Sequence, residues 1–115
     1  MTAVANSEYD LAPARVAELL AEGWPVIDVR EPHEREAGHI AGTRHIELGD
    51  LTARAGTLDQ AEPLIFYCRV GARSAMATQA FRASGFEAYH LTGGIMAWVQ
   101  AGLELKPADG HVAAH

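Results

Sequence analysis

The sequence has a single cysteine, Cys68, among its 115 residues. One cysteine cannot form an internal disulfide, so a scaffold held together by disulfides is excluded. Basic residues are also scarce, since nine lysines and arginines stand against fifteen aspartates and glutamates and give a formal net charge of −6. Nucleic-acid binding usually requires a basic face. We therefore expect no nucleic-acid partner.

Long apolar segments are missing as well. No run approaches the roughly 20 residues of a membrane span, and the opening MTAVANSEYD lacks the pattern of a secretory signal. We expect no membrane contact and a cytoplasmic location, where a thiol stays reduced. The length and the hydrophobic fraction of 49% fit one domain with a core of its own. We assign residues 1–105 to this domain and expect residues 106–115, which show no periodicity, to form a flexible tail.

Segments typical of helices and strands alternate along the chain. Apolar periodicity, with proline and glycine at the ends, predicts helices at residues 13–22, 31–37, 50–55, 74–84 and 95–101. Apolar, β-branched runs predict strands at 25–29, around 45–46, at 64–67 and at 86–91. This alternation predicts an α/β fold with a mostly parallel sheet covered by helices on both faces. Ligands of such folds bind at the carboxyl ends of the strands.

Cys68 occupies such a strand end, directly after the apolar run LIFY and before the helix expected from Ser74. The positive end of that helix, the N–H groups of the loop and the charges of Arg69 and Arg73 would favour a thiolate there. Gly71 would permit a tight curl of the loop. A lone cysteine can also be a small buried core residue. The joint arrangement favours a reactive thiol that faces an anionic substrate.

Three segments together resemble the single-domain rhodaneses, a family of thiosulfate sulfurtransferases. They are VIDVREPHEREAGHIAGTRHIEL at residues 26–48, CRVGAR at 68–73 and LTGGIMAW at 91–98. The resemblance implies a rhodanese-like three-layer α/β domain, in which helices flank a five-stranded parallel sheet on both faces. The chain departs from the family at Ala41 and Thr43, where proline and alanine are usual, and this should affect loop stiffness more than chemistry.

The resemblance also implies a reaction. Cys68 would attack the outer sulfur of thiosulfate, expel sulfite and pass the sulfur from its persulfide to cyanide, a thiol or a sulfur-accepting protein. Asp28 and Arg30 would brace the active-site loop, or would form a buried ion pair without a chemical role. The substrate-binding residues would be those of the loop itself, namely Arg69, Val70, Gly71, Ala72 and Arg73.

Other interpretations stay open. A persulfide carrier or binding module for a dedicated partner protein would keep the same loop. Phosphatases of the Cdc25 type and arsenate reductases share the fold, but their loop follows C-x5-R, whereas the spacing here is C-x4-R. We expect no metal, because the six histidines form no helical i, i+4 pair and no H-E-x-x-H set. We also expect no cofactor, because no glycine-rich nucleotide loop is present.

Overall fold

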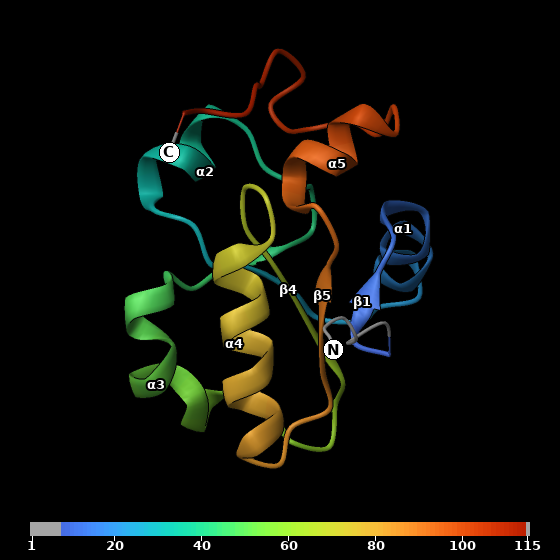
Figure 1. The fold of residues 1–115 in the computed structure, drawn as a ribbon. Coiled ribbons are helices and arrows are strands. Elements are labelled where there is room, and N and C mark those ends of the chain that lie inside the picture. The colour runs from blue at the N-terminus through green and yellow to red at the C-terminus, as the bar shows by residue number, and fades with distance from the viewer. Residues whose placement is uncertain (1–7, 115) are drawn as a thin grey trace.

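The computed structural model describes residues 8–114 and arranges them in three layers around a parallel sheet (Figure 1). The strand order is β1-β5-β4-β2-β3, and every pairing is parallel. This confirms the fold class that the sequence predicts. The five strands are β1 (Asp10–Leu11), β2 (Val26–Asp28), β3 (Arg44–His45), β4 (Leu64–Tyr67) and β5 (Ala88–Leu91).

Helices cover both faces of the sheet, with α3 and α4 on one side and α1 on the other (Figure 1). The central strand β4 is apolar throughout because its residues alternate between two buried clusters. Leu64 and Phe66 belong to one cluster and Ile65 and Tyr67 to the other. The helices are α1 (Pro13–Ala21), α2 (Pro32–Ala37), α3 (Leu51–Arg54), α4 (Ala72–Ala83) and α5 (Gly94–Gln100), with 3-10 turns η1 (Leu48–Asp50) and η2 (Ala55–Thr57) beside α3. None of the described helices is long and apolar enough to cross a membrane.

The element bounds differ from the predicted ones in two places that matter for the site. Strand β1 has only two residues, too few for a periodic pattern, and its pairing with β5 fixes it instead. Helix α4 begins at Ala72, two residues before the expected start at Ser74, because Gly71 turns the chain into the helix with φ of +113°. The N-terminus of α4 is therefore closer in sequence to Cys68 than predicted.

Residues 106–114, where the sequence predicts a flexible tail, lie against α2 and the loop that follows β4. The backbones of His39 and Lys106 exchange two hydrogen bonds of 2.8 and 2.9 Å, and the His111 N–H donates to the Ala37 carbonyl at 2.9 Å. Arg69 Nε donates to the Ala113 carbonyl at 3.2 Å. Most of these hydrogen bonds join backbone groups, and Val112 is the apolar residue of the segment that packs against the core, so the sequence shows no periodic pattern there. Residues 1–7 of the expected domain and residue 115 of the expected tail lie outside the described residues.

Candidate active site

Cys68 follows β4 directly, and its side chain is enclosed by the loop that leads into α4. Its Sγ accepts hydrogen bonds from the backbone N–H of Gly71 at 3.1 Å and of Ser74 at 3.4 Å. The residue is only 1% exposed. Two N–H groups and the positive end of a twelve-residue helix thus surround one sulfur atom. This environment stabilises a negative charge on that sulfur.

Helix α5 holds the backbone of the same loop from the other side. The Cys68 carbonyl accepts from the Ile95 N–H at 2.9 Å, and the Arg69 carbonyl accepts from the Met96 N–H at 3.1 Å. Gly94 starts the helix with φ of +65°, and a Cβ atom there would collide with the Arg69 carbonyl and lie 2.6 Å from the Cys68 oxygen. The segment LTGGIMAW therefore needs glycine at this position to fix the loop.

Asp28 and Arg30 form a completely buried ion pair at the end of β2. Asp28 accepts from Arg30 Nε at 2.9 Å and from Arg30 Nη2 at 2.8 Å, and Nη2 also donates to the Gly38 carbonyl at 2.8 Å. Burial by itself opposes the charge, but the hydrogen bond and charge of Asp28 outweigh it and raise the pKa of Arg30 above its usual value. The pair joins the sheet to the turn at Gly38, and neither side chain hydrogen-bonds to Cys68 within residues 8–114.

Arg73 is paired with a carboxylate that the sequence reasoning missed. Its Nη1 and Nη2 donate to the two oxygens of Glu34 at 2.8 and 2.9 Å, and the Glu34 side chain is fully buried. Both nitrogens thus face α2 and hold it against the start of α4. The sequence carries no sign of this pairing, because Glu34 belongs to the polar stretch EPHEREA, in which Glu31 and Glu36 are exposed.

The Glu34 carboxylate should make folding sensitive to acid. Burial alone would raise its pKa, but the hydrogen bonds from Arg73 and from the Glu31 N–H outweigh burial and lower the pKa from 4.5 to about 2. Because the folded-state pKa is the lower one, the carboxylate stabilises the fold above pH 4.5, and this contribution disappears as the pH falls through about 2. We expect it to reach about 3 kcal/mol at neutral pH.

Urea unfolding at several pH values would test this expectation. The difference in free energy of unfolding between the wild type and Glu34→Gln should be largest at neutral pH and should shrink on acidification. Glu36→Gln is a matched control, because Glu36 is an exposed residue of the same helix. A difference that does not depend on pH would contradict the assigned charge.

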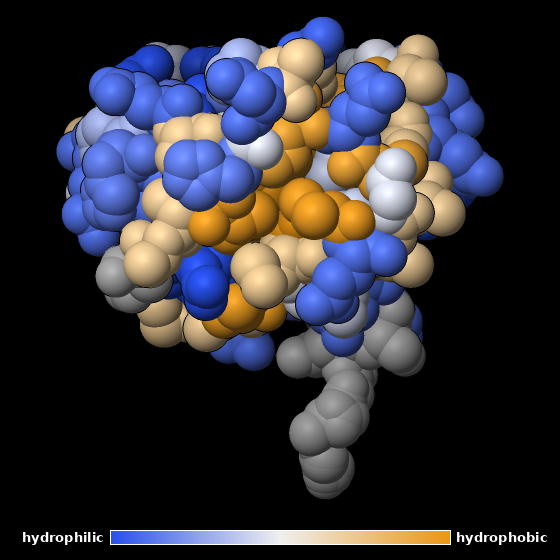
Figure 2. Space-filling view, turned by 90° about the horizontal axis from the view of Figure 1, so that it is seen from above, coloured by the Kyte–Doolittle hydropathy of each residue, from blue (hydrophilic) through white to orange (hydrophobic). Residues whose placement is uncertain are grey.

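A shallow hollow of about 310 Å³ opens over the loop and is lined by Arg69, Val70, Ala72 and Arg73. Of the guanidinium nitrogens of Arg69, only Nε has a hydrogen-bond partner within residues 8–114. Val70 is 55% exposed. The view onto the upper end of the molecule shows apolar side chains gathered at the centre and hydrophilic ones around them (Figure 2). The residues that line the hollow thus combine two cationic side chains with the small Ala72 and the exposed, apolar Val70.

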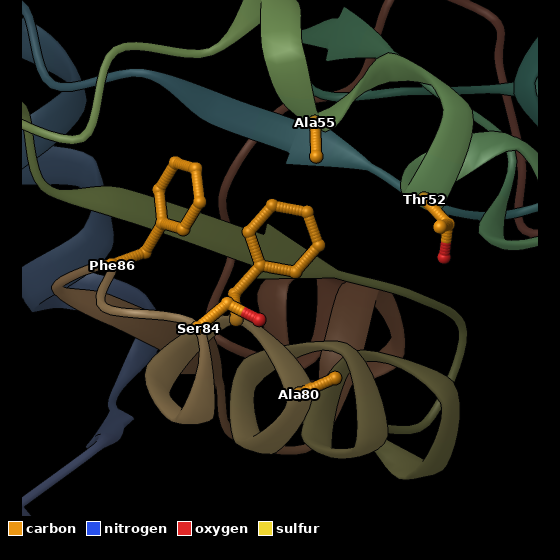
Figure 3. A pocket seen from close by; sticks show the side chains of 6 residues that line it. Thr52, Ala55, Ala80, Ser84 and Phe86 are labelled. Carbon is orange, nitrogen blue, oxygen red and sulfur yellow. The ribbon is translucent and has the colours of Figure 1, made fainter.

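A second pocket lies elsewhere, between the α3 region and α4, and has a different character (Figure 3). Its volume is about 120 Å³. Within the described part of the chain, its only polar lining side chains are the hydroxyls of Thr52 and Ser84, and none of the lining side chains is charged at neutral pH. The lining residues are Thr52, Ala55, Ala80, Phe81, Ser84 and Phe86. The reactive groups thus gather at the loop after β4 and not in this pocket.

Together, the fold and the loop define an α/β domain with a cysteine at the end of a central strand, in a cradle that stabilises anions. The chain belongs to the rhodanese family, since the family described as Rhodanese-like domain matches residues 12–101. This confirms the resemblance carried by the three sequence segments.

The chain is also similar to individual proteins and to solved structures. The chain is 35% identical over 100 residues to the thiosulfate sulfurtransferase GlpE of Pseudomonas aeruginosa, which covers 86% of this chain and 87% of that protein. It is 43% identical over 74 residues to the uncharacterized protein YqhL of Bacillus subtilis, which covers 64% of this chain but only 59% of that protein. The crystal structure of a rhodanese-related protein from Thermoplasma volcanium matches with a TM-score of 0.78 and 28% identity, over 84% of this chain and 95% of that one.

Proposed function

We propose that the protein is a sulfurtransferase that moves a sulfane sulfur from thiosulfate to an acceptor through a persulfide on Cys68. The two backbone N–H groups directed at Cys68 Sγ, at 3.1 and 3.4 Å, carry this proposal. The Cys68 thiolate attacks the outer sulfur of thiosulfate, a new S–S bond forms, and sulfite leaves with the electrons of the old one. A nucleophilic acceptor then takes the outer sulfur, and Cys68 is released as a thiolate.

The hollow over the loop suits both halves of the reaction. Arg69 would donate to the anionic oxygens of thiosulfate, and Arg73, whose Nη1 and Nη2 are held by Glu34, would contribute its positive charge. The loop residues Gly71 and Ala72 would leave the outer sulfur room to approach Cys68. The acceptor would be cyanide, a small thiol or a thiol of a partner protein, and the exposed Val70 would lie at the edge of that approach. We place the reaction in the reducing cytoplasm, where the single thiol stays free. No resident cofactor takes part.

The alternative of a phosphatase fits the loop less well. Arg73 is the arginine of the C-x4-R segment. Its Nη1 and Nη2 both donate to Glu34 and are not directed into the hollow. An in-line attack on phosphate would need such donors around the three equatorial oxygens. A persulfide carrier for one partner protein would share the first half of the reaction and differ only in the acceptor.

An intact-mass measurement tests the proposal directly. After treatment with thiosulfate the protein should gain one sulfur atom, located on Cys68 by peptide mapping, and cyanide should remove it with release of thiocyanate. A protein that gains no sulfur from thiosulfate or from any other sulfane donor would overturn the proposal. Turnover of an aryl phosphate by that same protein would favour the phosphatase.

Removing Arg69 should weaken thiosulfate binding in particular. We expect Arg69→Ala to raise the KM for thiosulfate about tenfold, because a charge-assisted hydrogen bond is lost, and to raise the KM for a neutral sulfane donor much less. Arg73→Ala should show the same preference and should also destabilise the fold, since Glu34 is left buried and unpaired. Arg54→Ala, which removes an exposed arginine of α3, is the control. If each variant raised the KM for both sulfur donors equally, the result would contradict a role of these arginines in binding the oxyanion.

A further inference from the structure

A chain of hydrogen-bonding groups runs from the active-site sulfur to a carboxylate on the edge strand of the sheet. Ser74 Oγ lies 3.5 Å from Cys68 Sγ and 3.3 Å from His90 Nδ1. On the other side of the imidazole, His90 Nε2 lies 2.6 Å from Asp10 Oδ1. These residues come from the loop after β4, from α4, from β5 and from β1, and β1 and β5 lie side by side (Figure 1).

The sheet register and the burial of the groups hold this chain in place. Asp10 and His90 are direct partners in the pairing of β1 with β5. Ser74 is completely buried, and the side chains of His90 and Asp10 are 12% and 35% exposed. A nucleophile linked to a base, which a third group orients, is the usual arrangement for activating a nucleophile. Here a serine hydroxyl stands between the nucleophile and the base.

The surroundings of His90 contain few other ionisable groups. Among the described residues, the titratable groups that face it are Asp10 of β1, its neighbour Tyr9 and, through Ser74, the Cys68 thiol. From α4, Arg82 stacks on Tyr9, with its guanidinium carbon 3.6 Å from the ring centroid. The α4 residues that face His90 are Ser74, Ala75, Thr78 and Gln79.

We propose that Asp10, His90 and Ser74 form a proton relay that keeps Cys68 in its thiolate form, an inference that rests on the proposed function. The Ser74 hydroxyl, which lies 3.2 Å from the Gly71 carbonyl as a donor, first turns its proton toward His90 Nδ1 at 3.3 Å. The S–H bond of Cys68 then breaks as its proton passes to Ser74 Oγ, and the hydroxyl proton of Ser74 passes to His90 Nδ1. The Nε2–H of His90 stays hydrogen-bonded to Asp10. The products are a thiolate, an unchanged serine hydroxyl and an imidazolium paired with a carboxylate, so atoms and charges balance.

The relay would act in both halves of the transfer. The resulting Cys68 thiolate accepts hydrogen bonds from the N–H groups of Gly71 and Ser74 and can attack the sulfur donor. When the acceptor removes the outer sulfur, the same imidazolium stabilises the departing Cys68 thiolate through Ser74. His90 and Asp10 touch neither donor, acceptor nor the Cys68 sulfur, so they are positioning residues, whereas Ser74 contacts that sulfur directly.

The rate at which iodoacetamide alkylates Cys68, followed by intact mass between about pH 5 and about pH 10, tests the relay. Glutamine can hydrogen-bond but cannot take up a proton, so His90→Gln should slow alkylation about tenfold near neutral pH. The two proteins should converge at the alkaline end, where solvent removes the thiol proton unaided. A merely structural effect of His90 would change the rate by the same factor at every pH, and that outcome, or no change at all, would overturn the relay.

Companion variants keep the test decisive. Asp10→Asn removes the charge that orients His90 but keeps an acceptor at a half-exposed site, so it should shift the pH profile in the same direction even if His90→Gln does not fold. His33→Gln, which changes an exposed histidine of α2, should leave the profile unchanged. Because alkylation needs no sulfur donor, the relay and the proposed function can fail separately. A wild type that takes no sulfur from any donor overturns the function, and identical pH profiles overturn the relay.

Discussion

Replacing Cys68 with alanine should reduce sulfur transfer from thiosulfate to cyanide to the uncatalysed background. The persulfide has no other sulfur atom to form on, since Cys68 is the only cysteine of the chain. The variant should still fold, because alanine leaves a small cavity and no unpaired charge at this position. Initial rates of thiocyanate formation measure the loss, and circular dichroism measures the fold.

Cys68→Ser provides the matched control for this experiment. The hydroxyl is close in size to the thiol and can still accept the N–H groups of Gly71 and Ser74, but it is a far weaker nucleophile toward sulfur. Binding of thiosulfate, measured by calorimetry, should therefore survive in Cys68→Ser while transfer is lost. Retained turnover in either variant would contradict a persulfide on Cys68.

Replacing Asp28 with alanine should cause the largest loss of stability. The Arg30 guanidinium would then remain fully buried without its carboxylate partner, which typically costs about 3–5 kcal/mol. That is a large part of the roughly 5–15 kcal/mol that holds an ordinary domain together. Urea unfolding at neutral pH would show the loss as a lower midpoint with an unchanged slope.

The double variant Asp28→Ala, Arg30→Met tests whether the unpaired charge is the cause. Removing both charges should recover much of the stability, because the buried guanidinium is gone and methionine fills part of its space. A double variant no more stable than Asp28→Ala would show that the hydrogen bond from Arg30 to the Gly38 carbonyl matters more than the charge. If the folded fraction of either variant still formed a persulfide, Asp28 and Arg30 would have a structural role and no direct role in the reaction.

The fold class and the position of Cys68 directly after a buried strand were predictable because their signals are local. The run LIFY is apolar at every position, and only a central strand covered on both faces buries alternate residues in two clusters. The segment CRVGAR places the thiol, the glycine and the helix start within a few residues of one another. Such short-range patterns survive without knowledge of the fold.

The partners of those groups were not predictable, because they are distant in the chain. Arg73 meets Glu34 across 39 positions, and His90 meets Asp10 across 80. Nothing distinguishes Glu34 from its exposed neighbours in the sequence, and the two residues of β1 show no pattern of their own. Pairing of β1 with β5 is what brings Asp10 into contact with His90.

The sequence alone thus determined the family and the alternation of strands and helices, and it singled out Cys68 as the candidate nucleophile, because hydrophobic periodicity and a short motif lie in consecutive residues. The tertiary structure decided how the charged residues around Cys68 pair with one another. It turned Arg73 toward a buried glutamate, enclosed Asp28 with Arg30, and aligned Asp10 and His90 behind Ser74. Charges act over a few ångströms in space, and the packing of the sheet and its helices sets those distances.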